Sequence, residues 1–275
     1  MKILVTGANG YIGRHIVKYL LDHDHEVIAA DLRYDNVDER AKRSHENIFS
    51  GDKDIYNKLG QPDVCIHLAW RDGFNHGSDA HIMDLPKHYE FLKNMIQGGL
   101  KRLDVMGTMH EVGYHEGAID ETTPCNPMSM YGIAKNALRE MLLVLTKNSD
   151  CKLTWTRAYY ILGDDEGNHS IFTKILEAAK EGKTTFPFNS GKNQYDFISV
   201  TELAKQISEV SIQDEVLGTI NVCSGKPVAL KDKVEEFIKE RHLNISLDYG
   251  KFPDRPYDSP IVYGDVSKIQ KILKK

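Results

Sequence analysis

The sequence lacks the features that mark several large classes of protein. Its cysteines are few, scattered and without a CxxC pair, which argues against a disulfide scaffold or a zinc site; they are Cys65, Cys125, Cys151 and Cys223. No apolar run approaches the roughly 20 residues that span a bilayer, and no tract of Lys and Arg suggests a membrane surface. A net charge of −5 gives no global basic surface, so we expect no nucleic-acid partner.

The first residues also lack the pattern of a secretory signal, because the short apolar run after Lys2 passes at once into glycines. Two catalytic motifs, that of a zinc protease and that of a Ser/His/Asp hydrolase, are present only in incomplete form. His110 and His115 flank Glu111 but are five residues apart, not four, and there is no Gly-x-Ser-x-Gly elbow. We therefore expect a cytoplasmic protein with no metal site and no Ser/His/Asp triad.

The composition is that of a soluble globular protein. The chain has 275 residues, of which 41% are hydrophobic and 27% charged. This length allows one large domain, or a domain with a smaller appendage.

The start of the chain is the most informative stretch. The apolar run Ile3-Leu4-Val5 shows no alternation, as in a strand that is covered on both faces. Gly7, Gly10 and Gly13 follow, and a helix with an apolar face comes next. A strand that enters a helix through glycines can bind a diphosphate, because the backbone and the first helical amides approach the phosphates. An ordinary tight turn is the alternative.

Asp31 makes the diphosphate interpretation more specific. It ends a second expected strand, 26–30, eighteen residues after Gly13. An acid in this place accepts hydrogen bonds from adenosine ribose hydroxyls and repels a 2′-phosphate, which favours NAD(H) over NADP(H). Arg33 lies close by and could stack on adenine or tolerate a phosphate, so NADP(H) stays open.

Alternating strand and helix patterns predict an α/β fold, a doubly wound parallel sheet of the Rossmann type with a small C-terminal lobe. Residues 1–163 are expected to form the dinucleotide-binding domain. Residues 164–275 are expected to form mostly a substrate-binding lobe, with segments around 195–223 that return to the first domain. The expected strands are 26–30, 48–52, 63–70, 103–106, 153–163, 219–222 and 246–249, and the expected helices are 86–97, 127–145, 171–181, 200–211 and 230–241.

A tyrosine and a lysine stand on the first turns of the helix expected after residue 127. Tyr131 and Lys135 are four residues apart, so they share a helix face. A nearby ammonium is expected to lower the pKa of a phenol, and the lysine can also bind the nicotinamide ribose. Thr108, at the end of the fifth strand, can donate a hydrogen bond to a substrate carbonyl oxygen.

Several loop residues have two interpretations. Trp70 is either a wall of the cofactor or substrate site or one buried aromatic in a surface loop, and Arg71 is a ligand for a phosphate or sugar hydroxyl or a loop residue. Asp52 either caps a helix or contacts adenine.

These motifs together resemble the NAD-dependent epimerase/dehydratase family, the extended short-chain dehydrogenases, over nearly the whole chain. The matching segments are 7–13 (GxxGxxG), Asp31, His67-Leu68-Ala69 (HxA), Thr108, 131–135 (YxxxK), 195–200 (RDFxxV) and the C-terminal 254–256 with 265–268. The departures are Met106-Gly107 for Ser-Ser, Val112-Gly113 for Tyr-Gly, Tyr160 for Asn, Tyr195 for Arg, and Asp84-Leu85-Pro86 before the fifth strand.

The resemblance implies a site for a dinucleotide and a nucleotide-linked sugar. Tyr131 is implied as the acid/base, with Lys135 and Thr108 as its catalytic partners. The expected cofactor-binding residues are Gly7, Gly10, Tyr11, Ile12, Gly13, Asp31, Leu32, Arg33, Asp52, Leu68, Ala69, Trp70, Lys135, Tyr159 and Ile161. The expected substrate-binding residues are Arg71, Thr108, His110, Tyr131, Tyr160, Asn168, Tyr195 and Arg255, of which Arg255 would hold the diphosphate.

The short chain and the lack of an acidic pair beside Thr108 favour a 4-ketoreductase over a dehydratase. Such enzymes reduce nucleotide-linked 4-keto-6-deoxyhexoses, as in deoxysugar synthesis for surface polysaccharides. A 4-epimerase with tightly bound NAD is the first alternative. A non-catalytic dinucleotide sensor is disfavoured because Thr108, Tyr131 and Lys135 are all present. By analogy with the family, a homodimer is expected.

Overall fold

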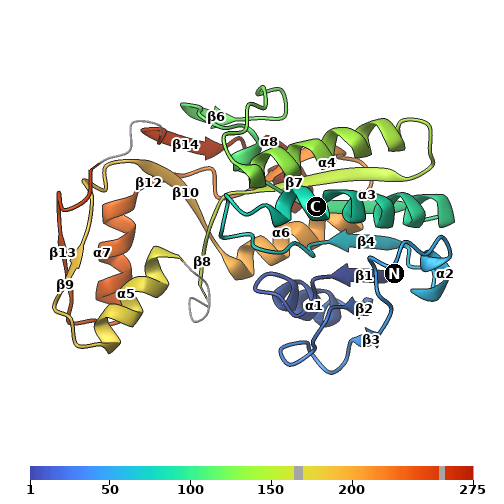
Figure 1. Cartoon of the computed structure of the whole chain (residues 1–275), viewed down its shortest axis with the longest axis horizontal. Helices are drawn as coiled ribbons and strands as arrows, with labels where there is room; N and C mark the ends of the chain where they lie inside the picture. Colours follow the sequence, from blue (N-terminus) through green and yellow to red (C-terminus); the bar gives the residue numbers. More distant parts are fainter. Residues whose placement is uncertain (164–169, 254–257, 275) are drawn as a thin grey trace.

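The computed structural model describes residues 1–163, 170–253 and 258–274. A seven-stranded sheet forms the centre of the larger part, in the order β11-β7-β5-β4-β1-β2-β3, and every neighbouring pair is parallel (Figure 1). Its strands are β1 (Lys2–Thr6), β2 (Glu26–Ala30), β3 (Lys42–Ser44), β4 (Val64–His67), β5 (Arg102–Thr108), β7 (Lys152–Ala158) and β11 (Gly218–Val222). This is the expected doubly wound α/β fold.

Helices cover both faces of this sheet. Ile3 and Val5 of β1 pack with α1 (Gly13–Asp22), α6 (Val200–Ile212) and α8 (Ser267–Leu273). Leu4, between them, points to the opposite face, which α2 (Ile55–Lys58), α3 (Ala80–Gly98) and α4 (Met130–Thr146) cover. Because β1 and β2 are buried on both faces, each contains a continuous apolar run.

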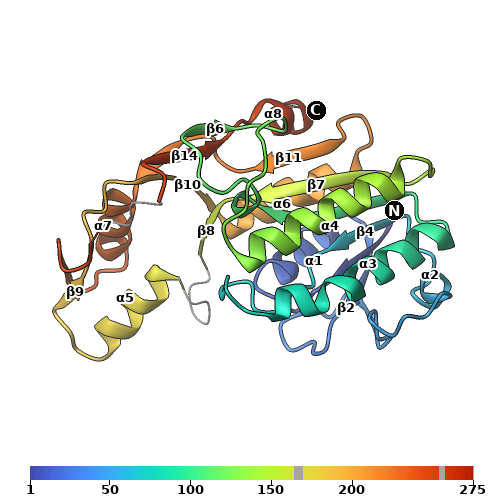
Figure 2. The same ribbon diagram turned by 45° about the horizontal axis from the view of Figure 1, so that its top comes forward.

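A second sheet leads from the large sheet to a smaller lobe (Figure 2). It contains β12 (Pro227–Ala229), β10 (Gln194–Ser199), β14 (Ile261–Gly264) and β6 (Gly117–Ile119), and β8 (Tyr160–Leu162) pairs with β10. The lobe holds α5 (Ile171–Lys180), α7 (Leu230–Glu240) and the pair β9 (Thr185–Pro187) and β13 (Ser246–Asp248).

The structure corrects several expected elements. The strand expected at 48–52 is wrong: β3 at Lys42–Ser44 takes the place beside β2, while 48–52 is turn and coil that ends in Gly51 at φ +74°. The strand expected at 153–163 is two strands, because the chain leaves the large sheet after Ala158 and β8 joins β10. Helix α3 begins six residues before Pro86, which lies inside it.

Other expected elements are confirmed. Helix α4 begins where the sequence places it, since the Ser129 hydroxyl accepts a hydrogen bond from the Gly132 amide and caps the helix. Helices α5, α6 and α7 agree with their expected ranges to within one residue at each end. Strand β11 pairs with β7, so this late segment lies in the large sheet. The division at residue 163 stays a prediction.

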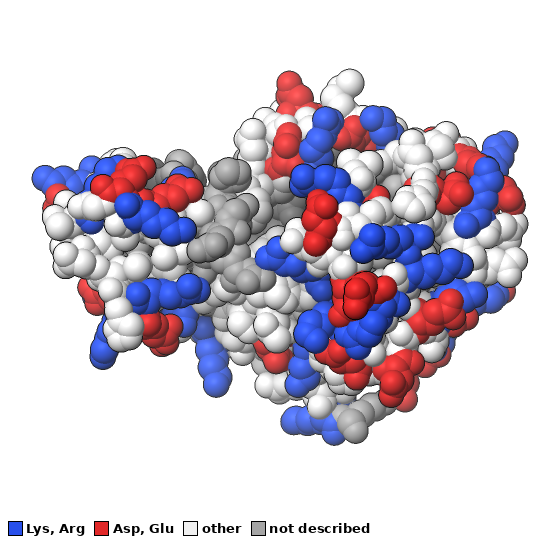
Figure 3. All heavy atoms as spheres, turned by 90° about the horizontal axis from the view of Figure 1, so that it is seen from below, with Lys and Arg blue, Asp and Glu red and all other residues white. Residues whose placement is uncertain are grey.

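The surface carries charges of both signs. On the face in Figure 3, Lys and Arg side chains alternate with Asp and Glu. Among the described residues, no helix has the length and apolarity needed to cross a membrane.

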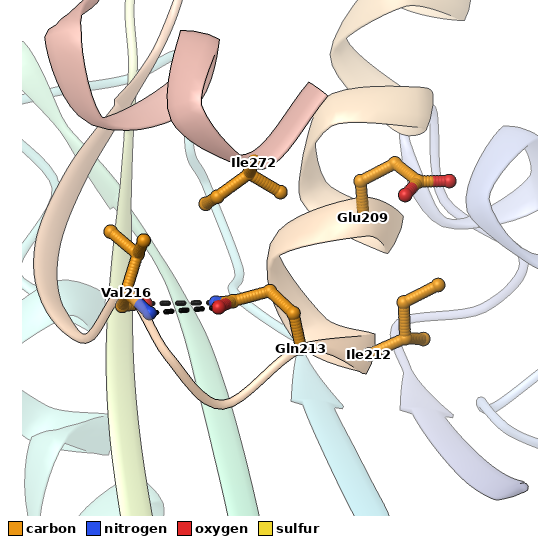
Figure 4. A pocket seen from close by; sticks show the side chains of 5 residues that line it. All are labelled: Glu209, Ile212, Gln213, Val216 and Ile272. Atoms are coloured by element: carbon orange, nitrogen blue, oxygen red, sulfur yellow. Dashed lines mark hydrogen bonds between the residues drawn. The ribbon is translucent and has the colours of Figure 1, made fainter. Parts of the chain in front are cut away.

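A small cavity of about 90 Å³ lies between the end of α6 and α8 (Figure 4). Gln213 and Val216 line it, and the Gln213 amide bonds the backbone of Val216. Val216 immediately precedes the segment that enters β11, so the cavity lies at the amino ends of the strands. It is therefore at the opposite edge of the sheet from the residues described next.

Candidate active site

The carboxyl ends of β1 and β4 lie side by side at the point where the strand order reverses. On one side the chain continues to β2 and β3, and on the other to β5, β7 and β11. In open α/β sheets this reversal leaves a crevice at the carboxyl edge, and ligands bind there.

The glycine turn after β1 leaves no room for side chains. Gly7 has φ +70°, and a Cβ on it would lie 2.8 Å from the backbone nitrogen of Ala69. A Cβ on Gly13 would lie 2.0 Å from the Gly7 carbonyl oxygen. In the described part of the chain no side chain caps helix α1. A bare backbone loop at a helix N-terminus fits a dinucleotide diphosphate.

Asp31 is held beside this turn at the end of β2. One carboxylate oxygen accepts a hydrogen bond from the Asn9 amide at 2.9 Å, and the other from the Leu32 amide at 2.6 Å. Each oxygen keeps a lone pair for a further donor, as a ribose hydroxyl would supply. The Leu32 side chain is 97% exposed, and Arg33 is exposed with its Nε 4.0 Å from Asp35.

Thr108 and Tyr131 come together at the carboxyl end of β5. Thr108 ends the strand and begins the 3-10 turn η1 (Met109–Glu111), where its hydroxyl accepts from the His110 amide at 3.3 Å. Burial, followed by the charge of Glu111, raises the pKa of Tyr131 above its usual value, and the nearby Thr108 side chain lowers it by less. The phenol is therefore held in its protonated form.

Lys135 is buried one helical turn further along α4. Its Nζ donates to the Met106 carbonyl at 2.7 Å and lies 3.9 Å from the centre of the Trp70 ring. Burial lowers the pKa of Lys135 to about 7, and Glu111 acts in the opposite direction. The ammonium is 6.0 Å from the Tyr131 ring centre. Lys135 is expected from the sequence to lower the pKa of Tyr131, but burial and the charge of Glu111 raise it instead.

A buried ion pair of Glu111 and Arg157 holds Thr108 in place through the Thr108 backbone amide. Glu111 is 0% exposed and accepts from the Thr108 amide at 2.7 Å, from Trp155 Nε1 at 2.9 Å and from the Arg157 guanidinium at 3.3 Å. Sequence reasoning missed this role. The signal was present, since Thr108-x-x-Glu111 is a capping box in which each residue bonds the backbone of the other.

Imidazole rings surround the Tyr131 phenol. His76, in the loop between β4 and α3, stacks on it with ring centres 5.0 Å apart, and its carbonyl accepts from the Tyr131 amide at 3.1 Å. His110 lies 4.3 Å from His76, and burial lowers the pKa of His110 to about 4, so it is neutral. His81 lies 5.2 Å from Tyr131. The sequence singled out His110 but neither His76 nor His81.

A model of the NAD-dependent epimerase/dehydratase family matches residues 3–223. The chain belongs to this family. It is 46% identical over 271 residues to dTDP-6-deoxy-L-talose 4-dehydrogenase (NAD(+)) of Aggregatibacter actinomycetemcomitans. The matched region covers 96% of this chain and 99% of that protein. It is 26% identical over 317 residues to a putative UDP-arabinose 4-epimerase of Arabidopsis thaliana, over 98% of this chain and 71% of that one.

Solved structures of this family share the fold. UDP-glucose 4-epimerase of Thermotoga maritima superposes with a TM-score of 0.83 at 22% identity, over 98% of this chain and 92% of that one. The dTDP-glucose 4,6-dehydratase DesIV of Streptomyces venezuelae, solved with NAD bound, gives 0.82 at 19% identity, over 98% and 90%.

One departure from the family pattern has a packing reason. The family places Ser-Ser where this chain has Met106-Gly107. A Cβ on Gly107 would lie 2.0 Å from Trp155 Nε1 and 2.5 Å from Glu111 Oε1. The indole that donates to Glu111 therefore occupies the space that a serine side chain would need.

Some of the remaining residues expected in the cofactor site lie beside the glycine turn, and others lie elsewhere. Leu68 follows β4 and packs against the apolar core beneath the glycine turn, as do Ile12 and Ile161. Tyr11 donates its hydroxyl to the Gly163 carbonyl, which connects the glycine turn to the end of β8. Tyr159 points away, since its buried hydroxyl bonds Asn221 at 3.2 Å. Asp52 pairs with Lys58 and bonds the Asp54 amide.

The other expected substrate residues, apart from Thr108, His110 and Tyr131, lie in separate places. Arg71 is exposed and pairs with Asp84 at 2.7 Å. Tyr160 and Tyr195 pack on each other in the second sheet with ring centres 4.4 Å apart. Asn168 and Arg255 lie outside the described residues.

Proposed function

We propose that the protein is an NAD(H)-dependent oxidoreductase that reduces the C4 keto group of a nucleotide-linked 4-keto-6-deoxyhexose. The observation that carries the proposal is the grouping of Thr108, at the carboxyl end of β5, with Tyr131 and the buried Lys135 of α4, next to the crevice formed by the glycine turn. The likeness to a 4-dehydrogenase of a dTDP-linked 6-deoxyhexose supports this substrate class, because dehydrogenation and reduction at C4 are the same reaction in opposite directions.

The reduction adds a hydride to the carbonyl carbon and a proton to the carbonyl oxygen. Bound NADH supplies the hydride. Tyr131 supplies the proton, which the phenol carries in this structure because burial raises its pKa. The Thr108 hydroxyl donates to the same oxygen and stabilises the charge that develops there. Lys135 binds the nicotinamide ribose and places a positive charge below the phenol.

The position of Glu111 disfavours a dehydratase. A dehydratase of this type needs acidic groups beside the catalytic threonine that reach the substrate. Glu111 is the acid nearest in sequence to Thr108, and it is fully buried and bound by Arg157. A 4-epimerase remains the alternative, because a UDP-glucose 4-epimerase shares this fold.

The test is a panel of 4-keto-6-deoxyhexose nucleotides assayed by the loss of NADH absorbance. A reductase consumes one NADH for each keto sugar that it reduces. An epimerase purifies with tightly bound NAD and interconverts 4-epimers without net consumption. A dinucleotide sensor binds NADH and turns over none of the panel, which would contradict both enzymatic proposals. A place in deoxysugar synthesis for surface polysaccharides and a homodimer, both implied by the family resemblance, stay predictions.

Asp31 is proposed to set the preference for NADH over NADPH. Because its carboxylate is held beside the glycine turn, Asp31→Ala removes a charged acceptor for the ribose hydroxyls. A charged hydrogen bond contributes about 1.5–3 kcal/mol, so the Kd for NADH should rise about 10- to 100-fold while the Kd for NADPH falls or stays. Titration of cofactor fluorescence measures both constants.

Asp35→Ala is the matched control, since Asp35 is an exposed acid in the same loop. It should change neither constant. A wild-type protein that prefers NADPH would contradict the role of Asp31 and assign the adenosine ribose end to Arg33.

A further inference from the structure

The buried Lys135 ammonium has two partners. The Met106 carbonyl oxygen, from β5, accepts its hydrogen bond at 2.7 Å. The indole ring of Trp70, from the segment after β4, presents its face with the ring centre 3.9 Å from Nζ. This distance is well inside the range of a cation–π interaction, and tryptophan is the strongest of the aromatic side chains in that role.

Histidines hold the Trp70 ring in this orientation. His88 stacks on the indole with ring centres 4.4 Å apart and an angle of 19° between the rings. Trp70 Nε1 donates to His81 Nδ1 at 2.9 Å, so His81 carries its proton on Nε2, which donates to the Asn75 carbonyl at 2.9 Å. His67 Nε2 lies 2.9 Å from His88 Nδ1 and fixes the stacking ring in turn.

We propose that Trp70 is a positioning residue for Lys135: its indole face and the Met106 carbonyl together hold the ammonium, in its charged form, beneath Tyr131. The proposal rests on the proposed function for the use of that charge in catalysis. Its structural part, the control of the ionisation of Lys135 by Trp70, does not depend on any substrate. In this role Trp70 is a permanent part of the protein's own site rather than a wall that only a bound ligand contacts.

The charge of Lys135 is sensitive to such a contact because burial has already brought its pKa to about 7. The titratable groups around it are Tyr131, Glu111, His67 and His88. Burial lowers the pKa of His88 to about 3 and that of His67 far below its usual value, so both rings are neutral near pH 7. Because both rings are neutral, the side-chain groups that favour the charged form of Lys135 are the Trp70 indole face and the Glu111 carboxylate.

The experiment compares Trp70→Phe with Trp70→Leu in the full-length protein. Both variants lose the hydrogen bond to His81, but only the phenylalanine keeps an aromatic face, so their difference isolates the contact with the ammonium. The readout is the titration of the lysine ε-carbons by ¹³C NMR, in which Lys135 titrates far below the exposed lysines and is assigned by its loss in Lys135→Met.

We expect the Lys135 midpoint to fall by about one pH unit in Trp70→Leu and by less in Trp70→Phe. The alkaline limb of the pH profile of kcat should move with it on any keto sugar that the wild type reduces. A midpoint that stays in place in a folded Trp70→Leu protein overturns the proposal. If the wild type reduces none of the keto sugars, the proposed function is overturned. The titration of Lys135 then decides the role of Trp70 by itself.

Fluorinated tryptophan provides a second measurement that does not depend on the folding of the leucine variant. Each added fluorine weakens the negative potential of the ring face with little change in its size. The other tryptophan, Trp155, donates to Glu111 from the interior behind Thr108. The Lys135 midpoint should fall stepwise as the number of fluorines rises, and a midpoint independent of fluorination contradicts the cation–π contact.

Discussion

Tyr131→Phe is expected to lower kcat by a factor between about 10² and 10⁴, the range that general acid catalysis contributes. The substitution removes only the phenol oxygen. The ring that stacks on His76 at 5.0 Å and the backbone bond to the His76 carbonyl both remain, so the loop should keep its place. The Kd for NADH should therefore change little. Initial rates from NADH absorbance and binding from cofactor fluorescence measure the two effects separately.

Tyr114→Phe is the control for the loss of a hydroxyl. Tyr114 is exposed, follows η1 by three residues, and bonds Glu116 at the surface. This variant should keep the wild-type kcat. A Tyr131→Phe enzyme with undiminished turnover would remove Tyr131 from the catalytic role and transfer proton donation to another group at the end of β5.

Local patterns in the sequence predict the first half of the fold well. The glycine turn depends on residues within a few positions of one another, and Asp31 on a fixed spacing of eighteen residues from Gly13, so spacing carries the information. The first two strands also follow from a local pattern, because β1 and β2 are buried on both faces and each contains a continuous apolar run. These features are sufficient to predict the crevice at the carboxyl ends of β1 and β4.

The second sheet could not be predicted in the same way. Tyr195 of β10 pairs with Val262 of β14, and Val262 pairs with Gly117 of β6. These strands are short and far apart in the sequence, so their pairing is decided by contacts that no local pattern contains. The break between β7 and β8 is hidden for a related reason: the sequence is apolar on both sides of Tyr159.

The candidate site shows the same division. Thr108, Tyr131 and Lys135 are recognisable by spacing and place in the chain, whereas their supporting groups come from elsewhere. The loop that carries His76 reads as an ordinary polar connection until it folds over Tyr131. In the sequence, Glu111 is a single acid too far from Thr108 to serve a dehydratase, and only the pairing with Arg157 of β7 shows that it is an interior ion-pair partner.

The ion pair of Glu111 and Arg157 leads to the largest expected effect on stability. Glu111→Ala leaves a buried guanidinium, the Trp155 indole N–H and the Thr108 amide without their acceptor. Removing one partner of a buried pair costs about 3–5 kcal/mol, far more than the pair itself contributes. The free energy of unfolding, measured with urea, should fall by this amount.

Two further variants separate the buried charge from other consequences of the substitution. Glu181→Ala removes an acid that pairs with Lys183 at the exposed surface after α5, and it should change the free energy of unfolding by less than about 0.5 kcal/mol. Combining Glu111→Leu with Arg157→Met should recover the part of the loss that comes from the unpaired guanidinium, because apolar side chains of similar size replace both charges. The Trp155 indole N–H and the Thr108 amide stay without an acceptor in this double variant. A loss below about 1 kcal/mol in Glu111→Ala would contradict this account, because burying an arginine without a counter-ion costs more free energy than that.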